Sequence, residues 1–217
     1  MIAVHTPRIF SPAIFSRFYL IVDDSWASRC SLLEVVQQAG EAGVKLVQYR
    51  NKTGSMKQAY EAGRALRSVA AERSMTFIVN DRCDLALALE ADGVHLGQAD
   101  LPLLLARKVV GQKMLIGVST HNPEQVRLAT EEGADYLGFG PIFTTRTKAN
   151  HEPVVGIEGL AGVRDLTPLP IIAIGGIVPD SVPALQAAGA NGVAVASAIL
   201  NASDRSKVLA RFMAHFQ

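Results

Sequence analysis

Eight short apolar runs that alternate with amphipathic segments constrain the fold of this chain more than any other feature of its sequence. The runs consist mainly of β-branched residues and leucine, and they are apolar at nearly every position. Strands that are buried on both faces show such continuous runs, because helices cover both sides of a parallel sheet. The runs lie at 18–22, 44–48, 76–79, 93–96, 114–118, 136–138, 171–174 and 192–195. They predict eight buried strands.

Segments with apolar residues on a 3.6-residue period separate these runs and predict helices. The predicted helices lie at 31–42, 57–72, 85–91, 101–109, 123–132, 159–166, 179–188 and 206–216. Since every strand is followed by a helix, the sequence predicts a single α/β domain, a (β/α)8 TIM barrel over residues 17–217. Residues 1–16 are interpreted as an N-terminal extension, either a short helix or a cap over the lower end of the barrel. A doubly wound open sheet is the alternative fold.

Composition narrows the range of partners. The chain has 217 residues, of which 49% are hydrophobic and 19% charged, and its net charge is +1. Such a balance is typical of a well-cored globular domain and gives no bulk attraction to nucleic acid or to a membrane surface. No stretch reaches the roughly 18 to 20 apolar residues of a spanning helix. We therefore expect neither nucleic acid nor a membrane as a partner, whereas a homo-oligomer stays open.

The two cysteines and the N-terminal segment bear on the compartment. Cys30 and Cys83 lie far apart and form no metal-binding spacing, so both are interpreted as ordinary thiols of a reducing compartment. The N-terminal segment has basic residues but no continuous apolar core before a cleavage site, which argues against a signal peptide. The sequence therefore predicts a cytoplasmic location.

Two cations follow the second apolar run. In a barrel of this kind the chemistry lies on the loops after the carboxyl ends of the strands. Arg50 and Lys52 are two residues apart, and strand side chains alternate with a period of two, so both can face the barrel mouth. Arginine makes a forked contact with phosphate and lysine adds a point charge, a combination that suits a polyphosphate. A solvated turn is the alternative.

Two aspartates follow the third and fourth runs. Asp81 and Asp100 each precede a predicted helix and could cap it, a frequent role of aspartate. They also stand at the ends of adjacent strands, where their carboxylates could converge. Mg²⁺ takes only one or two carboxylates and completes its shell with waters and phosphate oxygens. The pair therefore predicts a Mg²⁺ cofactor on a pyrophosphate, whereas nearby His95 is interpreted as a packing residue.

Polar residues also follow the fifth run. Ser119 is a candidate for a hydrogen bond to a ligand, and Asn122 is a candidate N-cap of the next helix. His121 is either a general base or a surface residue, and the sequence leaves both interpretations open.

A long polar loop follows the sixth run. It spans 138–156 and contains Thr144, Thr145, Thr147 and Lys148. Long loops without secondary structure are often functional lids, so we expect this segment to bridge the bound substrates as a mobile lid. A merely solvated loop is the alternative.

Small residues follow the last two runs. Gly175 and Gly176 come after the seventh run, and Ala196 and Ser197 come after the eighth. In such barrels these loops often bind phosphate through backbone N–H groups, with glycine allowing close approach. Two anion sites therefore emerge, one with cations and a metal and the other built from backbone. A pyrophosphate-bearing substrate and a monophosphate-bearing substrate would fit this arrangement.

With these features the chain resembles the thiamine phosphate synthase family over essentially its whole length. The matching segments are 47–52, 79–82, 93–100, 116–122, 138–143, 145–148, 173–177 and 195–199. Each segment is weakly specific, but the combination is highly specific. Tyr49, Asn51 and Thr144 depart from the family pattern, in which leucine, aspartate and proline are common, and these departures affect loop shape more than charge.

The resemblance implies a transferase that joins 4-amino-2-methyl-5-hydroxymethylpyrimidine diphosphate to hydroxyethylthiazole phosphate, giving thiamine phosphate and pyrophosphate by a dissociative, Mg²⁺-assisted substitution. It assigns the pyrimidine diphosphate to Gln48, Tyr49, Arg50, Asn51, Lys52, Asn80, Ser119 and Lys148, the thiazole phosphate to Thr145, Arg146, Thr147, Gly176, Ala196 and Ser197, and the metal to Asp81 and Asp100. Arg50, Lys52, Ser119 and Lys148 are the implied catalytic residues. No general base is needed, because the thiazole nitrogen already carries a lone pair.

Two alternatives stay open. Thiazole tautomerases share the fold and use a histidine placed like His121, but they tend to lack the Thr-x-Thr-Lys segment and the Asn-Asp pair that are present here. A non-enzymatic barrel would bind both phosphorylated molecules and release no pyrophosphate.

Overall fold

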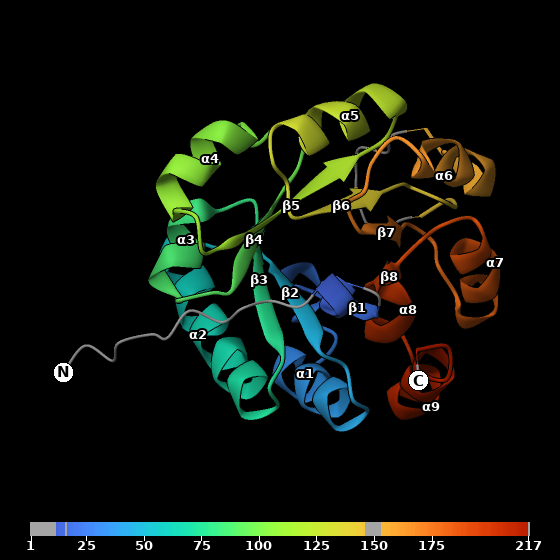
Figure 1. Cartoon of the computed structure of the whole chain (residues 1–217). Coiled ribbons are helices and arrows are strands. Elements are labelled where there is room, and N and C mark those ends of the chain that lie inside the picture. The colour runs from blue at the N-terminus through green and yellow to red at the C-terminus, as the bar shows by residue number, and fades with distance from the viewer. Residues whose placement is uncertain (1–11, 16, 146–152, 217) are drawn as a thin grey trace.

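The protein is a closed barrel of eight parallel strands surrounded by helices (Figure 1). The computed structural model describes residues 12–15, 17–145 and 153–216. The strands are β1 (Phe18–Asp23), β2 (Leu46–Arg50), β3 (Thr76–Asn80), β4 (Gly93–Leu96), β5 (Leu115–Thr120), β6 (Tyr136–Phe139), β7 (Ile171–Ile174) and β8 (Gly192–Val195). They pair in sequence order, and β8 closes on β1. The predicted TIM barrel is confirmed, and closure excludes the open-sheet alternative.

Helices follow the strands on the outside of the barrel (Figure 1). They are α1 (Leu32–Glu41), α2 (Met56–Glu72), α3 (Cys83–Ala88), α4 (Leu103–Val110), α5 (Pro123–Glu131), α6 (Gly156–Arg164), α7 (Val182–Ala187), α8 (Ser197–Leu200) and α9 (Arg205–Met213), with 3-10 turns η1 (Pro12–Phe15), η2 (Asp24–Trp26) and η3 (Pro179–Ser181). Asn122 caps α5, as predicted, because its side chain accepts a hydrogen bond from the backbone N–H of Gln125. The short helix α8 was not predicted.

The apolar residues form two layers, because strand side chains alternate between the barrel interior and the helices. The larger layer lies between the sheet and the helices. The smaller layer fills the barrel interior with Phe15, Tyr19, Ile21, Leu46, Ile78, Leu115, Tyr136, Ile172 and Ala194. Of the predicted N-terminal extension, the structure describes η1, whose Phe15 stacks on Tyr136 with ring centroids 4.4 Å apart. The interior is therefore packed below the open end.

Several strands extend past the apolar runs that predicted them. β2 continues through Arg50, β3 through Asn80 and β5 through Thr120, each one or two residues beyond its run. Backbone pairing continues there, as in the register that pairs Asp23 with Arg50. Polar side chains therefore stand on rigid strand ends rather than on loops.

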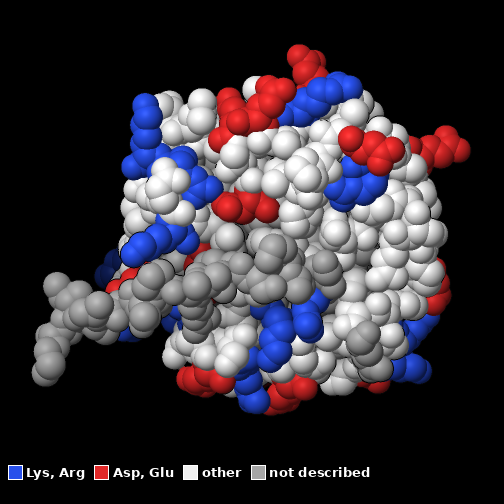
Figure 2. Space-filling view, viewed as in Figure 1, with Lys and Arg blue, Asp and Glu red and all other residues white. Residues whose placement is uncertain are grey.

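Figure 2 shows acidic and basic groups over much of the face it presents, with several Lys and Arg side chains gathered along its upper left edge. None of the helices in the described ranges is long and apolar enough to cross a membrane. Cys30 and Cys83 are free thiols.

Candidate active site

A cavity of about 550 Å³ opens at the carboxyl ends of the strands, where the sequence places its polar residues. Its lining comes from the ends of all the strands or the loops that follow them. It includes Asp23, Arg50, Lys52, Asn80, Asp81, Gln98, Asp100, Ser119, His121, Thr145, Gly176, Ala196 and Ser197. Most of the predicted site residues in the described part of the chain therefore lie around one space.

Arg50 points inward from β2 and forms an ion pair with Asp23 of β1. Asp23 is almost fully buried, at 1% exposure, and its other carboxylate oxygen accepts a hydrogen bond from the Ser25 amide. Because the charge of Asp23 holds the guanidinium at the cavity wall, Arg50 is fixed before any ligand binds. No role was predicted for Asp23, although it directly follows the first apolar run and Asp81 comes two residues after the third.

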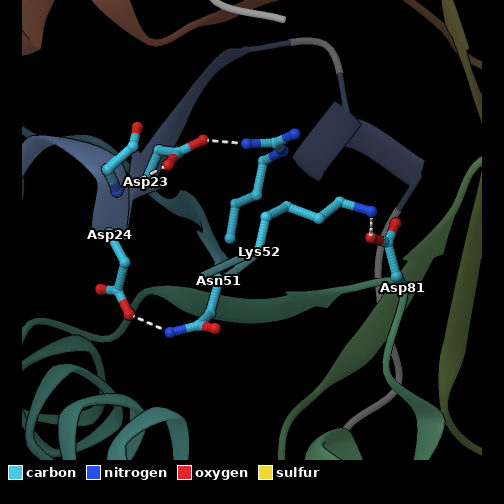
Figure 3. A network of polar contacts seen from close by, with 7 residues as sticks. Asp23, Asp24, Asn51, Lys52 and Asp81 are labelled. Atoms are coloured by element: carbon cyan, nitrogen blue, oxygen red, sulfur yellow. Dashed lines mark hydrogen bonds and ion pairs between the residues drawn. The ribbon is translucent and has the colours of Figure 1, made fainter. Parts of the chain in front are cut away.

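Lys52 crosses the cavity edge to Asp81 and forms an ion pair with its carboxylate (Figure 3). The lysine side chain is half exposed, whereas Asp81 is largely buried. Asp81 has a left-handed backbone conformation with φ of 62°, which aspartate tolerates better than most residues. Its amide donates to the carbonyl oxygen of His95 over 2.7 Å, which ties the turn after β3 to β4.

The carboxylates of Asp81 and Asp100 converge, as the strand order predicted. Burial raises the pKa of Asp81 to about 6, a hydrogen bond with Asp100 contributes to the increase, and Lys52 partly offsets both effects. Asp100 also accepts from the Gly97 amide over 2.7 Å. The capping interpretation is wrong for both residues, since α3 is preceded by Arg82 and α4 by Pro102 as N-cap. Two carboxylates thus lie together on a cavity that Arg50 and Lys52 also line, whereas binding of a metal and a diphosphate there stays a prediction.

The raised pKa of Asp81 predicts an unusual pH dependence of stability in the absence of metal. The folded state holds this proton up to about pH 6, whereas an aspartate in the unfolded chain, with its ordinary pKa of 3.8, releases it earlier. Between these values the unfolded state binds fewer protons, so the free energy of unfolding falls as pH rises. We expect this fall in chemical denaturation with a chelator present, measured as the difference between the wild type and Asp81→Asn. A difference that is flat from about pH 4 to 7 would contradict the raised pKa.

The structure does not bring Tyr49 and Asn51 to the cavity, although the resemblance had assigned both to the diphosphate. Tyr49 is one residue out of phase with the inward-facing Arg50, so it packs among the helices, and its hydroxyl donates to Asp24 over 2.7 Å. Asn51 also donates to Asp24, away from Lys52 (Figure 3). These two residues brace the loop after β2 rather than line the site.

Gln48 lies one layer below the main cavity. It is buried at 3% exposure and borders a small cavity of about 30 Å³ beneath the first. Its side-chain nitrogen Nε2 donates a hydrogen bond to the Tyr19 hydroxyl over 2.8 Å. Asn80, the last residue of β3, borders both cavities. Gln48 therefore belongs to the floor of the site.

Ser119 and His121 both line the cavity from the end of β5. The Ser119 hydroxyl lies 2.9 Å from Nε2 of His95, a buried residue of β4. His121 Nδ1 makes a short contact with the carbonyl oxygen of Gly140, and its amide donates to Gln125. The structure thus places His95 in a polar contact, whereas the sequence had favoured a packing role.

The opposite side of the cavity is built from small residues and backbone. Gly176, Ala196 and Ser197 line it, together with Thr145 from the loop after β6. The helix α8 begins at Ser197, directly after β8, and the leading amides of a helix have no acceptor within it. Thr145, Gly176, Ala196 and Ser197 carry no positive charge, so this wall offers a ligand backbone N–H donors instead.

Gly176 is required for the shape of this wall. Its φ is 65°, and a Cβ atom there would lie 2.7 Å from the carbonyl oxygen of Thr144 and 2.8 Å from Cβ of Phe143. We expect Gly176→Ala to lower the free energy of unfolding by about 1–3 kcal/mol and to weaken binding of a phosphorylated ligand. Thermal denaturation and calorimetry would measure both. Gly162→Ala in α6 is the control, since nothing lies within 4 Å of its added Cβ; equal effects of the two substitutions would count against the steric argument.

The remaining site predictions concern Arg146, Thr147 and Lys148, which lie outside the described residues. Their assignment to the two phosphates stays a prediction, as does the lid that they were expected to form.

The fold and the cavity together define the class of protein. It is a (β/α)8 barrel whose open end has two cations and two carboxylates on one side and a wall of small residues and backbone on the other. The family model described as "Thiamine monophosphate synthase" matches residues 18–199. A thiamine-phosphate synthase of Pelotomaculum thermopropionicum is 47% identical over 181 residues, which is 83% of each chain. That of Syntrophomonas wolfei is 43% identical over 186 residues, covering 86% of this chain and 89% of the relative. The chain belongs to the thiamine monophosphate synthase family.

A solved structure agrees with this assignment. Thiamine phosphate pyrophosphorylase from Pyrococcus furiosus superimposes with a TM-score of 0.85 at 34% identity, covering 94% of this chain and 97% of the other. The resemblance drawn from the sequence motifs is therefore confirmed.

Proposed function

We propose that the chain catalyses the formation of thiamine phosphate from a pyrimidine diphosphate and a thiazole phosphate, with release of pyrophosphate. The observation that carries the proposal is the convergence of Arg50, Lys52, Asp81 and Asp100 on one side of a single cavity. A glycine-lined backbone wall faces them, in a chain that belongs to the thiamine monophosphate synthase family. This pairing of an ionic side and a backbone side matches one diphosphate and one monophosphate substrate.

Asp81 and Asp100 would hold a Mg²⁺ ion in this proposal. Their donor set fits the ion, because Mg²⁺ uses one or two carboxylates and takes its other ligands from water and phosphate. No cluster of three or more His, Cys, Asp or Glu side chains suited to a metal occurs within 12–15, 17–145 or 153–216. When bound, the ion would neutralise charge on the departing pyrophosphate.

The protein's own groups would act mainly by positioning and by electrostatic stabilisation. The carbon–oxygen bond to pyrophosphate breaks and its electron pair leaves with the oxygen, where Arg50 and Lys52 supply positive charge. The lone pair of the thiazole nitrogen then forms the new carbon–nitrogen bond. Atoms and charges balance without a proton transfer, so the lack of an assigned general base is consistent with this reaction.

Pyrophosphate release tests the proposal. Release should require both substrates and Mg²⁺, each omitted in turn. No release of pyrophosphate from folded protein would instead favour the tautomerase alternative, and His121→Asn would then be the next variant to test. The relatives and the solved structure described above do not favour that alternative. Binding of both phosphorylated molecules without turnover would favour the non-enzymatic barrel.

The finer expectations about location and assembly stay predictions. Two free thiols agree with a reducing compartment, and we propose that the protein is located in the cytoplasm. A homo-oligomer would be tested by light scattering.

A further inference from the structure

A continuous chain of hydrogen bonds crosses the barrel beneath the cavity and ends at Ser119. Gln48 donates to the Tyr19 hydroxyl over 2.8 Å, and that hydroxyl lies 3.0 Å from the hydroxyl of Tyr136. The Tyr136 hydroxyl lies 3.0 Å from Nδ1 of His95, and Nε2 of His95 lies 2.9 Å from the Ser119 hydroxyl. The chain thus links five strands, and of its members only Ser119 lines the large cavity.

The inner members of the chain are shielded from water. Tyr19, Gln48, His95 and Tyr136 are all buried, and Phe15 stacks beneath Tyr136. Burial is the largest cause that raises the pKa of both tyrosines, so their hydroxyls keep their hydrogens at any ordinary pH. A buried polar group without a partner is costly, so each hydrogen in the chain needs an acceptor.

This requirement fixes the direction of the chain. Nε2 of Gln48 faces the Tyr19 hydroxyl and can only donate, so Tyr19 accepts from it and donates its own hydrogen to Tyr136. Tyr136 in turn donates its hydrogen to Nδ1 of His95, which must therefore be the unprotonated ring nitrogen. The hydrogen of a neutral imidazole then lies on Nε2 and is donated to Ser119.

We propose that His95 is a positioning residue, held by Tyr136 as the neutral Nε2–H tautomer, which makes Ser119 a hydrogen-bond donor toward the cavity. Because the Ser119 oxygen accepts from His95, its hydrogen is directed to an acceptor atom of the substrate. A serine next to a histidine often indicates an activated nucleophile, in which the serine donates to the ring. Here the polarity is reversed, and Ser119 orients substrate. The kinetic consequence rests on the function proposed above.

The tautomer can be measured without any substrate. Nitrogen-15 NMR distinguishes protonated from unprotonated ring nitrogens, and the signals of His95 are assigned by their absence from a His95→Gln variant. We expect a neutral ring with a protonated Nε2 and an unprotonated Nδ1 in the wild type. A protonated Nδ1, or an imidazolium at neutral pH, would overturn the proposal.

Kinetics test the effect on Ser119. Tyr136→Phe removes the donor that holds Nδ1 unprotonated, so we expect mixed tautomers and a kcat lowered about 3- to 10-fold, the range of one neutral hydrogen bond. In a Ser119→Ala background the same substitution should have no further effect on kcat. An equal loss in both backgrounds would show a merely structural role and overturn the proposal.

Thr120→Val is the matched control. It removes a fully buried hydroxyl on the same strand, which donates to the Gly138 carbonyl oxygen and is not part of the chain. It should lower stability without changing the His95 tautomer. If the wild type shows the expected tautomer but releases no pyrophosphate, the proposed function fails and the tautomer assignment stands. An active enzyme with the other tautomer would refute the tautomer assignment and leave the proposed function standing.

Discussion

Asp81→Asn should reduce pyrophosphate release by roughly 100-fold or more, the usual scale for removing a group that stabilises transition-state charge. The side chain keeps its shape but loses the charge that would hold Mg²⁺ beside the departing diphosphate. The metal-free variant should nevertheless be at least as stable as the wild type at neutral pH, because burial and Asp100 disfavour the ionised carboxylate. Steady-state kinetics over a Mg²⁺ titration and denaturation with a chelator would measure both effects.

Asp84→Asn is the control for this experiment. Asp84 lies in α3, is exposed at 58% and pairs with Arg82 rather than facing the cavity. It should leave the rate and its Mg²⁺ dependence unchanged. Equal rates for wild type and Asp81→Asn at all Mg²⁺ concentrations would remove Asp81 from the metal site.

Arg50→Met should abolish most activity and also destabilise the fold by about 3–5 kcal/mol, since it leaves a buried charge unpaired. Asp23 is 1% exposed and loses the guanidinium that compensates its charge. Adding Asp23→Asn removes that charge, so the double variant should regain much of the stability and none of the activity. Urea denaturation and pyrophosphate release on the single and double variants separate the two roles of Arg50.

Arg211→Met provides the comparison for stability. Arg211 pairs with Asp180 at the surface, where both side chains are more than half exposed. Exposed pairs contribute about 0–1 kcal/mol, so this variant should unfold nearly as the wild type does. If Arg50→Met lowered the free energy of unfolding as little as Arg211→Met does, the ion pair with Asp23 would not act as a buried charge interaction.

The strands were predictable because each is buried on both faces, so a short continuous apolar run in the sequence indicates each of them. β4, β7 and β8 match their apolar runs residue for residue. Strands such as β2, β3 and β5 extend past their runs because backbone pairing does not depend on apolar side chains, as β2 shows at Arg50. The helix α8 was missed because four residues are too few to display a helical period.

The sequence by itself determined the barrel and the position of its polar rim, since both follow from local periodicity and from the rule that strand ends share one edge. It also placed Asp81 and Asp100 together, because β3 and β4 are adjacent along the chain. Only the tertiary structure decided which side chains pair across the interior. Tyr19 and Tyr136 are 117 residues apart and meet only because the barrel closes with one register. That register also put Asp23 against Arg50 and left Tyr49 facing the helices, since a shift of one residue exchanges the two faces of a strand.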